Sequence, residues 1–206
     1  LYWHFFYHRH NDFWKAQAFK RLTPLVASTE MLVCGEDLGM IPASVPEVMN
    51  KLQILSLEIE RMPKRPQREF SDMFNLPYHS VCTTSTHDMT PLRNWWKEDP
   101  EKTQRYYNHV LQRIGEAPDE CTAEIVAQII SNHLKTRSML TIIPLQDWFA
   151  MDDSIKRKDI ESERINVPAN STHYWRYRMH ITLEQLLQAD NLNNKIVSLI
   201  EEAGRK

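Results

Sequence analysis

The sequence predicts an α/β fold in which parallel strands, buried on both faces, alternate with helices. Short apolar runs are separated by segments with helical periodicity, which is typical of βα units. The runs are nearly continuous in apolar residues, as in parallel strands that helices cover on both sides. Acidic side chains follow the runs, where barrel strands carry their reactive groups. Four such units make half of an eight-stranded barrel, and the runs lie at 31–34, 54–59, 80–84 and 139–143.

Two helices and a long loop are expected before residue 80. The segment 11–27 has apolar residues close to helical spacing, so it is the first helix. A second helix is expected over 44–52, because Ser44 and Glu47 have the spacing of a capping box and a proline lies in the first turn. The polar, proline-rich stretch 62–77 then predicts a loop.

Three helices are expected between the third and fourth strands, at 90–96, 99–114 and 122–134. Asp99 is a good cap for the second of them, and Pro100 suits its first helical position. The alternation of strand and helix signals that defines the fold class therefore continues through this part of the chain.

The last part of the chain is expected to be loop and helix. Asp147 follows the fourth strand as another acidic residue at a strand end. The charged run 156–164 is expected to be a solvated loop or helix face. Thr182 with Gln185 caps the final helical stretch, which continues to Gly204.

Composition predicts one globular domain over residues 1–206, with no second domain. The net charge of −2 argues against a nucleic-acid partner. The apolar runs are far shorter than the ~20 residues that span a bilayer, so no membrane partner is expected. Three widely spaced cysteines fit reduced thiols and a cytoplasmic location, with Cys34 and Cys82 expected to be buried. The chain lacks an initiator Met, which is typical of a piece of a longer protein.

Glu36 and Asp88 are the candidate catalytic pair, and both follow predicted strands. Glycosidic bond chemistry needs one carboxylic acid with a raised pKa and one ionised group near the developing oxocarbenium ion. The chain has only four glycines, and Gly35 and Gly39 bracket Glu36 and Asp37, so the backbone can turn sharply and leave room for a ligand. An acidic pair at a strand end also serves as a helix cap or a salt bridge, so spacing alone leaves these alternatives open.

Four motifs occur together in this chain, namely CGEDLGMIPASVPEVM (34–49), STHDMTPLRNWW (85–96), PLQDWFAMDD (144–153) and ERINVPANSTHYWRYR (163–178). In their order and spacing they resemble amylomaltase-type 4-α-glucanotransferases, glycoside hydrolase family 77, over about Phe6 to Leu187. The segment ILSLEIERMPK (54–64) is similar to the multidomain, plant-cytosolic-like branch of that family.

The resemblance implies a retaining (β/α)₈ barrel that moves α-1,4-glucan segments between sugars without a cofactor, of which this chain is the C-terminal half, about strands 5–8. Glu36 then matches the acid/base. Asp88 matches a carboxylate that holds sugar hydroxyls in the distorted ring. The residues matched to substrate binding are His87, Asp37, Arg164 and Asn166.

The family nucleophile, an Asp in an Arg-x-Asp-His motif, has no counterpart in this sequence. Arg157-Lys158-Asp159 matches the motif only in part, because it lies late in the chain, in a charged run, and no His follows it. A second departure is Met89, where many members have Asn. The chain is therefore expected to be inactive alone and to associate with the missing N-terminal half or with itself. An α-glucan hydrolase or a non-catalytic glucan-binding module are the alternative functions.

The remaining motifs favour structural roles. His8 with His10, and His79 with Cys82 and His87, lack a recognised ligand spacing, so no metal is expected. The aromatic residues in 2–14 are expected to pack a helix onto the domain rather than to stack on sugars. The pair 95–96 is expected to be core or to face the glucan.

Overall fold

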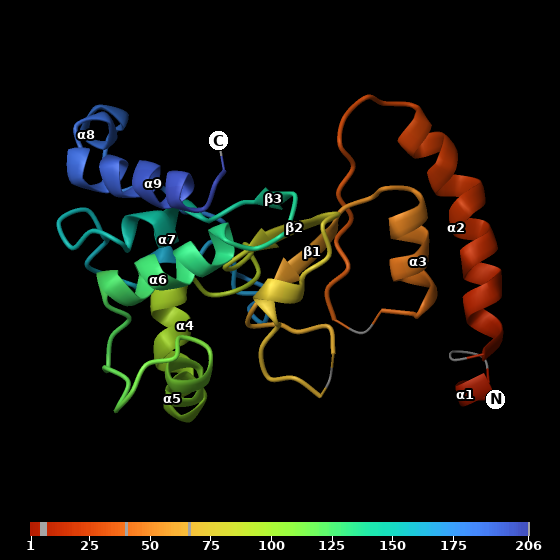
Figure 1. Ribbon diagram of the computed structural model, residues 1–206, viewed down its shortest axis with the longest axis horizontal. Coiled ribbons are helices and arrows are strands. Elements are labelled where there is room, and N and C mark those ends of the chain that lie inside the picture. Colours follow the sequence, from red (N-terminus) through yellow and green to blue (C-terminus); the bar gives the residue numbers. More distant parts are fainter. Residues whose placement is uncertain (5–7, 40, 66, 206) are drawn as a thin grey trace. The chain divides into compact units, whose positions relative to one another are not determined.

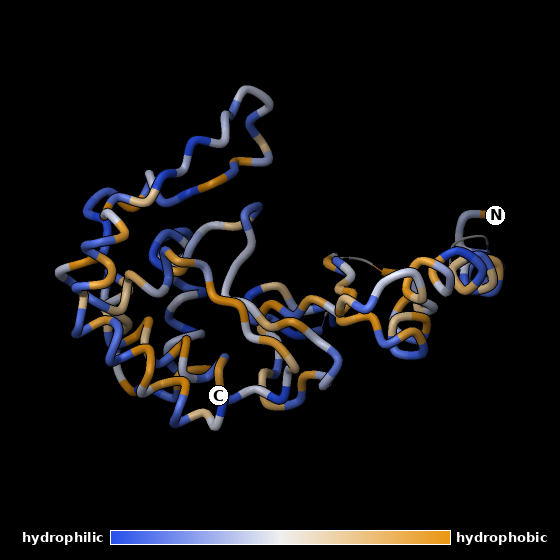
Figure 2. Tube along the Cα trace, turned by 90° about the horizontal axis from the view of Figure 1, so that it is seen from above, coloured by the Kyte–Doolittle hydropathy of each residue, from blue (hydrophilic) through white to orange (hydrophobic). Residues whose placement is uncertain are grey.

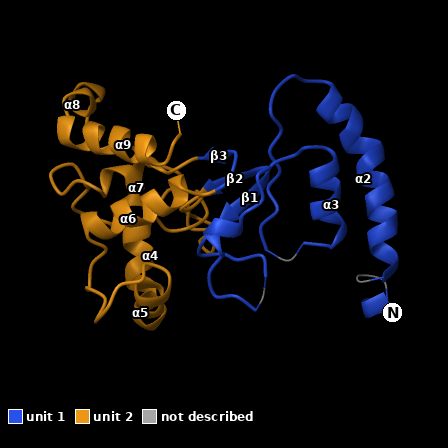
Figure 3. Ribbon diagram, in the orientation of Figure 1, with its two compact units in different colours: residues 1–82, 137–141 blue, residues 83–136, 142–206 orange. Residues whose placement is uncertain are grey.

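The computed structural model describes residues 1–4, 8–39, 41–65 and 67–205. These residues form two compact units, and the expected single domain over 1–206 stays a prediction (Figure 3). Unit 1 comprises residues 1–82 and 137–141, and unit 2 comprises 83–136 and 142–206.

The elements of unit 1 are α1 (Tyr2–His4), α2 (His10–Ala27), α3 (Ser44–Lys51), β1 (Ser56–Ile59), the 3₁₀ turn η2 (Met73–Asn75), β2 (Ser80–Thr83) and β3 (Leu140–Thr141) (Figure 1). The elements of unit 2 are α4 (Leu92–Glu98), α5 (Pro100–His109), α6 (Ala123–Leu134), α7 (Leu145–Phe149), the 3₁₀ turn η3 (Glu161–Glu163), α8 (Leu183–Leu187) and α9 (Asp190–Glu202).

The sheet has the strand order β1-β2-β3, and β2 pairs parallel to β3 with Val81 opposite Leu140. The predicted strand 31–34 is reduced to one parallel bridge between Cys34 and Leu55. Met31 is 77 % exposed, so the first part of this run has solvent beside it where a buried strand would have a neighbour. The parallel α/β class is confirmed, while a complete set of four strands is not observed among the described residues.

The long helix α2 lies against α3, and hydrophobic residues recur along both (Figure 2). None of the described residues of α2 is buried. Phe13 and Trp14 are 61 % and 46 % exposed, so the prediction that the aromatic stripe packs onto the domain is wrong for them. Residues 5–7 of that stripe lie outside the described part of the chain.

The start of α3 differs from the expected capping box. Ala43 occupies the cap position, and no side chain caps the helix. Ser44 lies inside the helix, while Glu47 pairs with Lys15 of α2 at 2.5 Å and with Lys51 one turn on at 3.1 Å. The ion pairs thus use the carboxylate that a capping box would need.

Local capping chemistry correctly predicts the starts of three other helices. The side chains of Asp99, Thr122 and Thr182 each accept a hydrogen bond from a backbone N–H in the first turn, and Thr182 forms the full capping box with Gln185. The last helical stretch is nevertheless broken between α8 and α9, because Ala189 leaves helical geometry with ψ of 61°.

Unit 2 has a core built on α4, α5 and α6. Trp95 and Trp96 are 6 % and 2 % exposed and meet Tyr106 edge-on, so the core interpretation of this pair is confirmed. The helix α5 ends at His109 rather than near 114, and the chain then passes through Gln112 with a φ of +55°. The backbone therefore leaves helical geometry within the range 99–114, over which the sequence predicts one continuous helix.

Cys34 is exposed, which corrects its predicted burial, while Cys82 and Cys121 are buried, and none of these three described cysteines forms a disulfide. Within the described residues, no helix has the length and apolar character that crossing a membrane requires. The same part of the chain holds no cluster of three potential metal ligands.

Candidate active site

The loop that carries Glu36 is fixed on both sides of that residue, to Leu55 just before β1 and to Leu57 within β1. The Gly35 N–H donates to the Leu55 carbonyl at 2.8 Å. The Asp37 carboxylate accepts a hydrogen bond from the Leu57 N–H, also at 2.8 Å. The backbone of residue 36 is thereby held against β1, while the Glu36 side chain is exposed to solvent.

Gly35 and Gly39 are each favoured over other residues for a different physical reason. A Cβ at Gly35 would lie 3.0 Å from Met49 Cε and 3.2 Å from Ile54 Cγ2, so core side chains fill the space that was expected for a ligand. Gly39 has a φ of +79°, which side chains disfavour, so it makes the expected turn.

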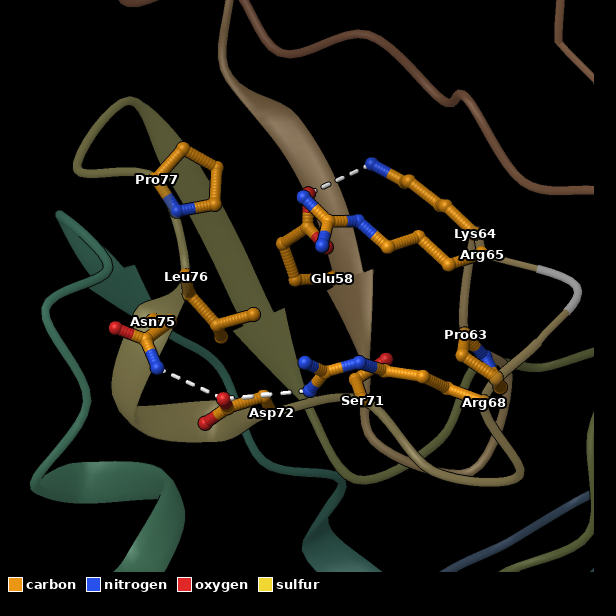
Figure 4. A pocket seen from close by; sticks show the side chains of 10 residues that line it. All are labelled: Glu58, Pro63, Lys64, Arg65, Arg68, Ser71, Asp72, Asn75, Leu76 and Pro77. Atoms are coloured by element: carbon orange, nitrogen blue, oxygen red, sulfur yellow. Dashed lines mark hydrogen bonds and ion pairs between the residues drawn. The ribbon is translucent and has the colours of Figure 1, made fainter.

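Asp37 is buried, at 5 % exposure, and both of its oxygens contact donors of its own chain. In addition to the Leu57 N–H, it accepts a hydrogen bond from Lys64 Nζ at 2.6 Å. Lys64 also donates to Glu58 Oε1 at 2.7 Å, at the edge of a pocket of about 310 Å³ (Figure 4). This arrangement favours a positioning role for Asp37 over direct contact with substrate.

Asp88, in the loop after β2, belongs to a second group of side chains, in unit 2. One Asp88 oxygen accepts a hydrogen bond from Asn166 Nδ2 at 2.5 Å, and the other lies 3.2 Å from His87 Nε2. Asn166 Oδ1 in turn accepts from the Trp175 indole N–H at 3.0 Å. The Trp175 ring lies 5.1 Å from the His87 ring, so the four side chains form a closed ring of contacts.

The segment before Asn166 is anchored by α4. Arg93 Nη1 donates to Glu163 Oε1 at 3.1 Å and to the Arg157 carbonyl at 2.7 Å. Asn94 Nδ2 donates to the Ile160 carbonyl at 3.0 Å. Glu163 is only 2 % exposed, so the prediction that the whole run 156–164 is solvated is wrong at this residue.

Burial raises the pKa of Glu163 to about 7. Arg93 opposes this rise, and the negative charge of Asp147 adds to it. Glu163 Oε2 is buried without a hydrogen-bond partner among the described residues, so the ion pair with Arg93 satisfies only one of the two oxygens.

Asp147, the acidic residue after the fourth predicted strand, has a structural role. It is fully buried, and its oxygens accept hydrogen bonds from the Thr84 hydroxyl at 2.5 Å and from the Leu92 N–H at 2.9 Å. The second bond places its charge at the start of α4, where a helix favours an anion.

The structure thus brings His87, Asp88 and Asn166 together in unit 2. Glu36 and Asp37 lie in unit 1. Arg164 is partly buried, and its Nε has no hydrogen-bond partner among the described atoms.

The spacing of residues in the sequence does not predict the contacts that Trp175 and Lys64 make. Trp175 and Asn166 both lie in the motif ERINVPANSTHYWRYR, and this shared motif indicates that they belong to one site. Lys64 closes the segment ILSLEIERMPK, but its two carboxylate partners lie 27 and 6 residues away in the sequence.

The family model of glycoside hydrolase family 77, described as 4-alpha-glucanotransferase, matches residues 1–184. The chain is 40 % identical over its full length to 4-alpha-glucanotransferase DPE2 of Oryza sativa subsp. japonica and covers 22 % of that protein. It is 29 % identical over 88 % of its length to a 4-alpha-glucanotransferase of Chlamydia caviae and covers 34 % of it. The chain therefore spans about a fifth to a third of the length of these relatives.

Solved structures agree at the level of the fold. The chain superposes with a TM-score of 0.67 on an amylomaltase from Streptococcus agalactiae in complex with acarbose, over 95 % of this chain and 35 % of that one, at 16 % identity. Amylomaltase from Corynebacterium glutamicum gives a TM-score of 0.61 over 82 % of this chain and 28 % of that one, also at 16 % identity. With the family match over most of its length, this chain belongs to the 4-alpha-glucanotransferase family.

Proposed function

We propose that this chain is the C-terminal half, about strands 5–8, of the (β/α)₈ barrel of a retaining 4-α-glucanotransferase. The whole protein moves α-1,4-linked glucosyl units from a donor glucan to an acceptor sugar. The ring of contacts formed by His87, Asp88, Asn166 and Trp175 is the observation that carries this proposal, because it joins two of the family-like motifs at one carboxylate.

Glu36 is the acid/base in this proposal. Its carboxylic acid protonates the glycosidic oxygen while a nucleophilic Asp, from a segment of the whole protein outside this chain, attacks the anomeric carbon. The Glu36 carboxylate then takes the proton from the acceptor hydroxyl as that oxygen displaces the enzyme carboxylate. An exposed Glu36 side chain on an anchored backbone suits both steps.

Asp88 is the carboxylate that binds sugar hydroxyls in the distorted ring, and His87 donates to the same sugar. Asn166 and His87 orient the Asp88 oxygens before substrate arrives. Orientation in advance makes such contacts effective at the transition state, since no reorganisation is then needed. Arg164 lies two residues before Asn166 and lines the same donor site in this proposal.

The chain alone is inactive in this proposal, since it supplies no nucleophile. It associates with the N-terminal half of its barrel or, when isolated, with itself. Met31 and Ile142, in the first and last predicted strands, are exposed hydrophobic residues. Their exposure supports the proposal that a partner covers this part of the chain. The three cysteines, none of which forms a disulfide among the described residues, support a cytoplasmic location.

Replacing Glu36 by Gln in the whole protein tests the proposal. Glu36→Gln removes the transferable proton, so kcat for disproportionation of maltotriose is expected to fall about 10²–10⁴-fold. Chromatography of the products measures glucose together with longer maltodextrins. The matched control is Glu30→Gln, an exposed glutamate six residues earlier, which is expected to keep its rate within about twofold.

Near wild-type transfer by Glu36→Gln would contradict the acid/base assignment. Glucose without longer maltodextrins from the unaltered protein would show a hydrolase instead. Glucan binding with no product in the unaltered protein would show a binding module. The isolated chain, assayed beside them, is expected to give no product.

A further inference from the structure

We propose that Lys64 is a positioning residue for Glu36. It holds the Asp37 carboxylate in place and, through Asp37, fixes the backbone of Glu36 against β1. This inference rests on the proposed acid/base role of Glu36. It assigns a function to a lysine whose segment the proposed mechanism does not otherwise use.

The first support is the geometry around Asp37. One Asp37 oxygen accepts a hydrogen bond from the Leu57 N–H in β1, and the other accepts from Lys64 Nζ at 2.6 Å. With the Gly35 N–H bonded to the Leu55 carbonyl, residue 36 has a fixed neighbour on each side. Since consecutive Cα atoms are separated by about 3.8 Å, these two anchors define where the Glu36 side chain begins.

The second support is the charge balance of this cluster. Asp37 and Glu58 are 5 % and 8 % exposed, and the Lys64 ammonium contacts both at 2.7 Å or less. Without the ammonium, two buried carboxylates would share one site, and like charges at that range disfavour each other. Glu58 is further fixed by the Ser56 hydroxyl at 2.8 Å. Asp37 is therefore the carboxylate that is expected to move.

The third support is the location of Lys64. Its side chain is 20 % exposed, so it is largely enclosed, whereas its neighbour Arg65 is exposed. Lys64 lies in the loop after β1, where it contacts Glu58 (Figure 4). Its bond to Asp37 joins this loop to the loop that carries Glu36. An enclosed ammonium between two carboxylates links segments 27 residues apart.

A displaced Glu36 would weaken proton transfer more than it weakens glucan binding. A misplacement of about 1 Å can cost about 10²-fold in rate when a catalytic group must meet a reacting atom. The loss depends on the leaving group, because fluoride departs without protonation while a sugar oxygen does not. This dependence separates a positioning role from a general structural one.

The experiment compares Lys64→Met, Lys64→Arg and the matched control Arg65→Met in the whole protein, with two donors. On maltotriose, kcat of Lys64→Met is expected to fall about 10- to 100-fold with KM changed less than about threefold. First-turnover fluoride release from α-maltosyl fluoride is expected to fall less than about threefold. Lys64→Arg is expected to recover most of the loss, and Arg65→Met to stay within about twofold on both donors.

Equal losses of Lys64→Met on both donors would overturn the proposal, since they would report a general disturbance of the site. A double variant with Glu36→Gln separates it from the proposed function. If Lys64 acts through Glu36, the Lys64→Met loss on maltotriose disappears in that background. A loss that persists there overturns the positioning role alone, while a near wild-type Glu36→Gln overturns the acid/base assignment itself.

A second variant applies if Lys64→Met loses its cooperative thermal transition. Asp37→Asn removes the charge that Lys64 contacts and keeps an acceptor oxygen for the Leu57 N–H. It is expected to show the same difference between donors at a smaller size, about threefold on maltotriose. Equal losses on the two donors would again contradict the positioning role.

Discussion

The surroundings of Glu36 and of Asp88 differ in which part of the residue the protein holds. At Glu36 the neighbours hold the backbone, through the Gly35 N–H and the Asp37 carboxylate, and the side chain is exposed. At Asp88 the carboxylate itself is held, by Asn166 at 2.5 Å and by His87 at 3.2 Å.

This difference matches two kinds of work that a carboxyl group can do. A group that gives up and regains a proton must reach its partner oxygen and keep its own oxygens available. A carboxylate that stabilises developing charge or fixes hydroxyl groups works best when its direction is set in advance. The comparison therefore predicts that the residues around Asp88 act on its orientation, whereas those around Glu36 act on its position.

The largest effect is expected from Asp88→Asn in the whole protein. The amide keeps the shape but loses the charge, so kcat on maltotriose should fall about 10²–10³-fold. Calorimetric affinity for an unreacted glucan should change less than about tenfold, because the contacts strengthen only as the ring distorts. Asp119→Asn, an exposed aspartate of the same unit, is the control. A large loss of glucan affinity at unchanged kcat would contradict the role assigned to Asp88, since Asp88 would then bind substrate without stabilising the transition state.

A smaller effect is expected from Asn166→Ala, which removes the amide that orients Asp88. A hydrogen bond to a charged group contributes about 1.5–3 kcal/mol, so kcat should fall about 10- to 100-fold. Trp175→Phe removes the N–H that orients the Asn166 amide and shortens the ring that lies beside His87, and a loss of a few-fold is expected.

The double variant Asp88→Asn with Asn166→Ala sharpens this test. If Asn166 acts on the direction of the Asp88 carboxylate, the second change should add little to the first. Steady-state kinetics of the four proteins in the cycle measure this directly. Independent, additive losses would show that Asn166 has its own contact with substrate and does not act through Asp88.

The sequence predicts where a helix begins when a single capping residue determines that start. Asp99 and Thr122 cap helices because a short side chain reaches the first-turn N–H groups of its own segment. Ser44 has the same pattern, but Glu47 pairs with Lys15 of another helix, and the sequence around Ser44 holds no sign of that partner. The run 31–34 has strand composition, yet a strand also needs a neighbour along its whole length.

The candidate site shows the same limit at longer range. His87 and Asp88 are adjacent, so the sequence places them at one site, and the structure shows that their side chains are in contact. Asn166 lies 78 residues from Asp88, and only the resemblance to a family indicated that they belong to one site. Arg93 and Lys64 carry charges that composition alone assigns to solvent, whereas burial and the partners of each decide its role.

The last effect is on stability rather than on kcat. It concerns the protonation of Glu163, which lies against Arg93 in the segment before Asn166. Glu163 has a pKa of about 7 in the folded protein, raised from 4.5 mainly by burial. Because the folded state holds this proton more tightly than the unfolded state, the stabilisation is fully present below pH 4.5. It is lost as the pH rises through 7, and it is on the order of 3 kcal/mol.

Glu163→Gln should therefore flatten the fall in unfolding temperature between pH 5 and pH 8 by several degrees. Differential scanning calorimetry of the whole protein at a series of pH values measures the change. The control is Glu161→Gln, an exposed neighbour in the same 3₁₀ turn that also contacts α4 through Asn94. A slope unchanged by Glu163→Gln would mean that Arg93 keeps this carboxylate ionised throughout. The segment that orients Asp88 would then be anchored equally at every pH in this range.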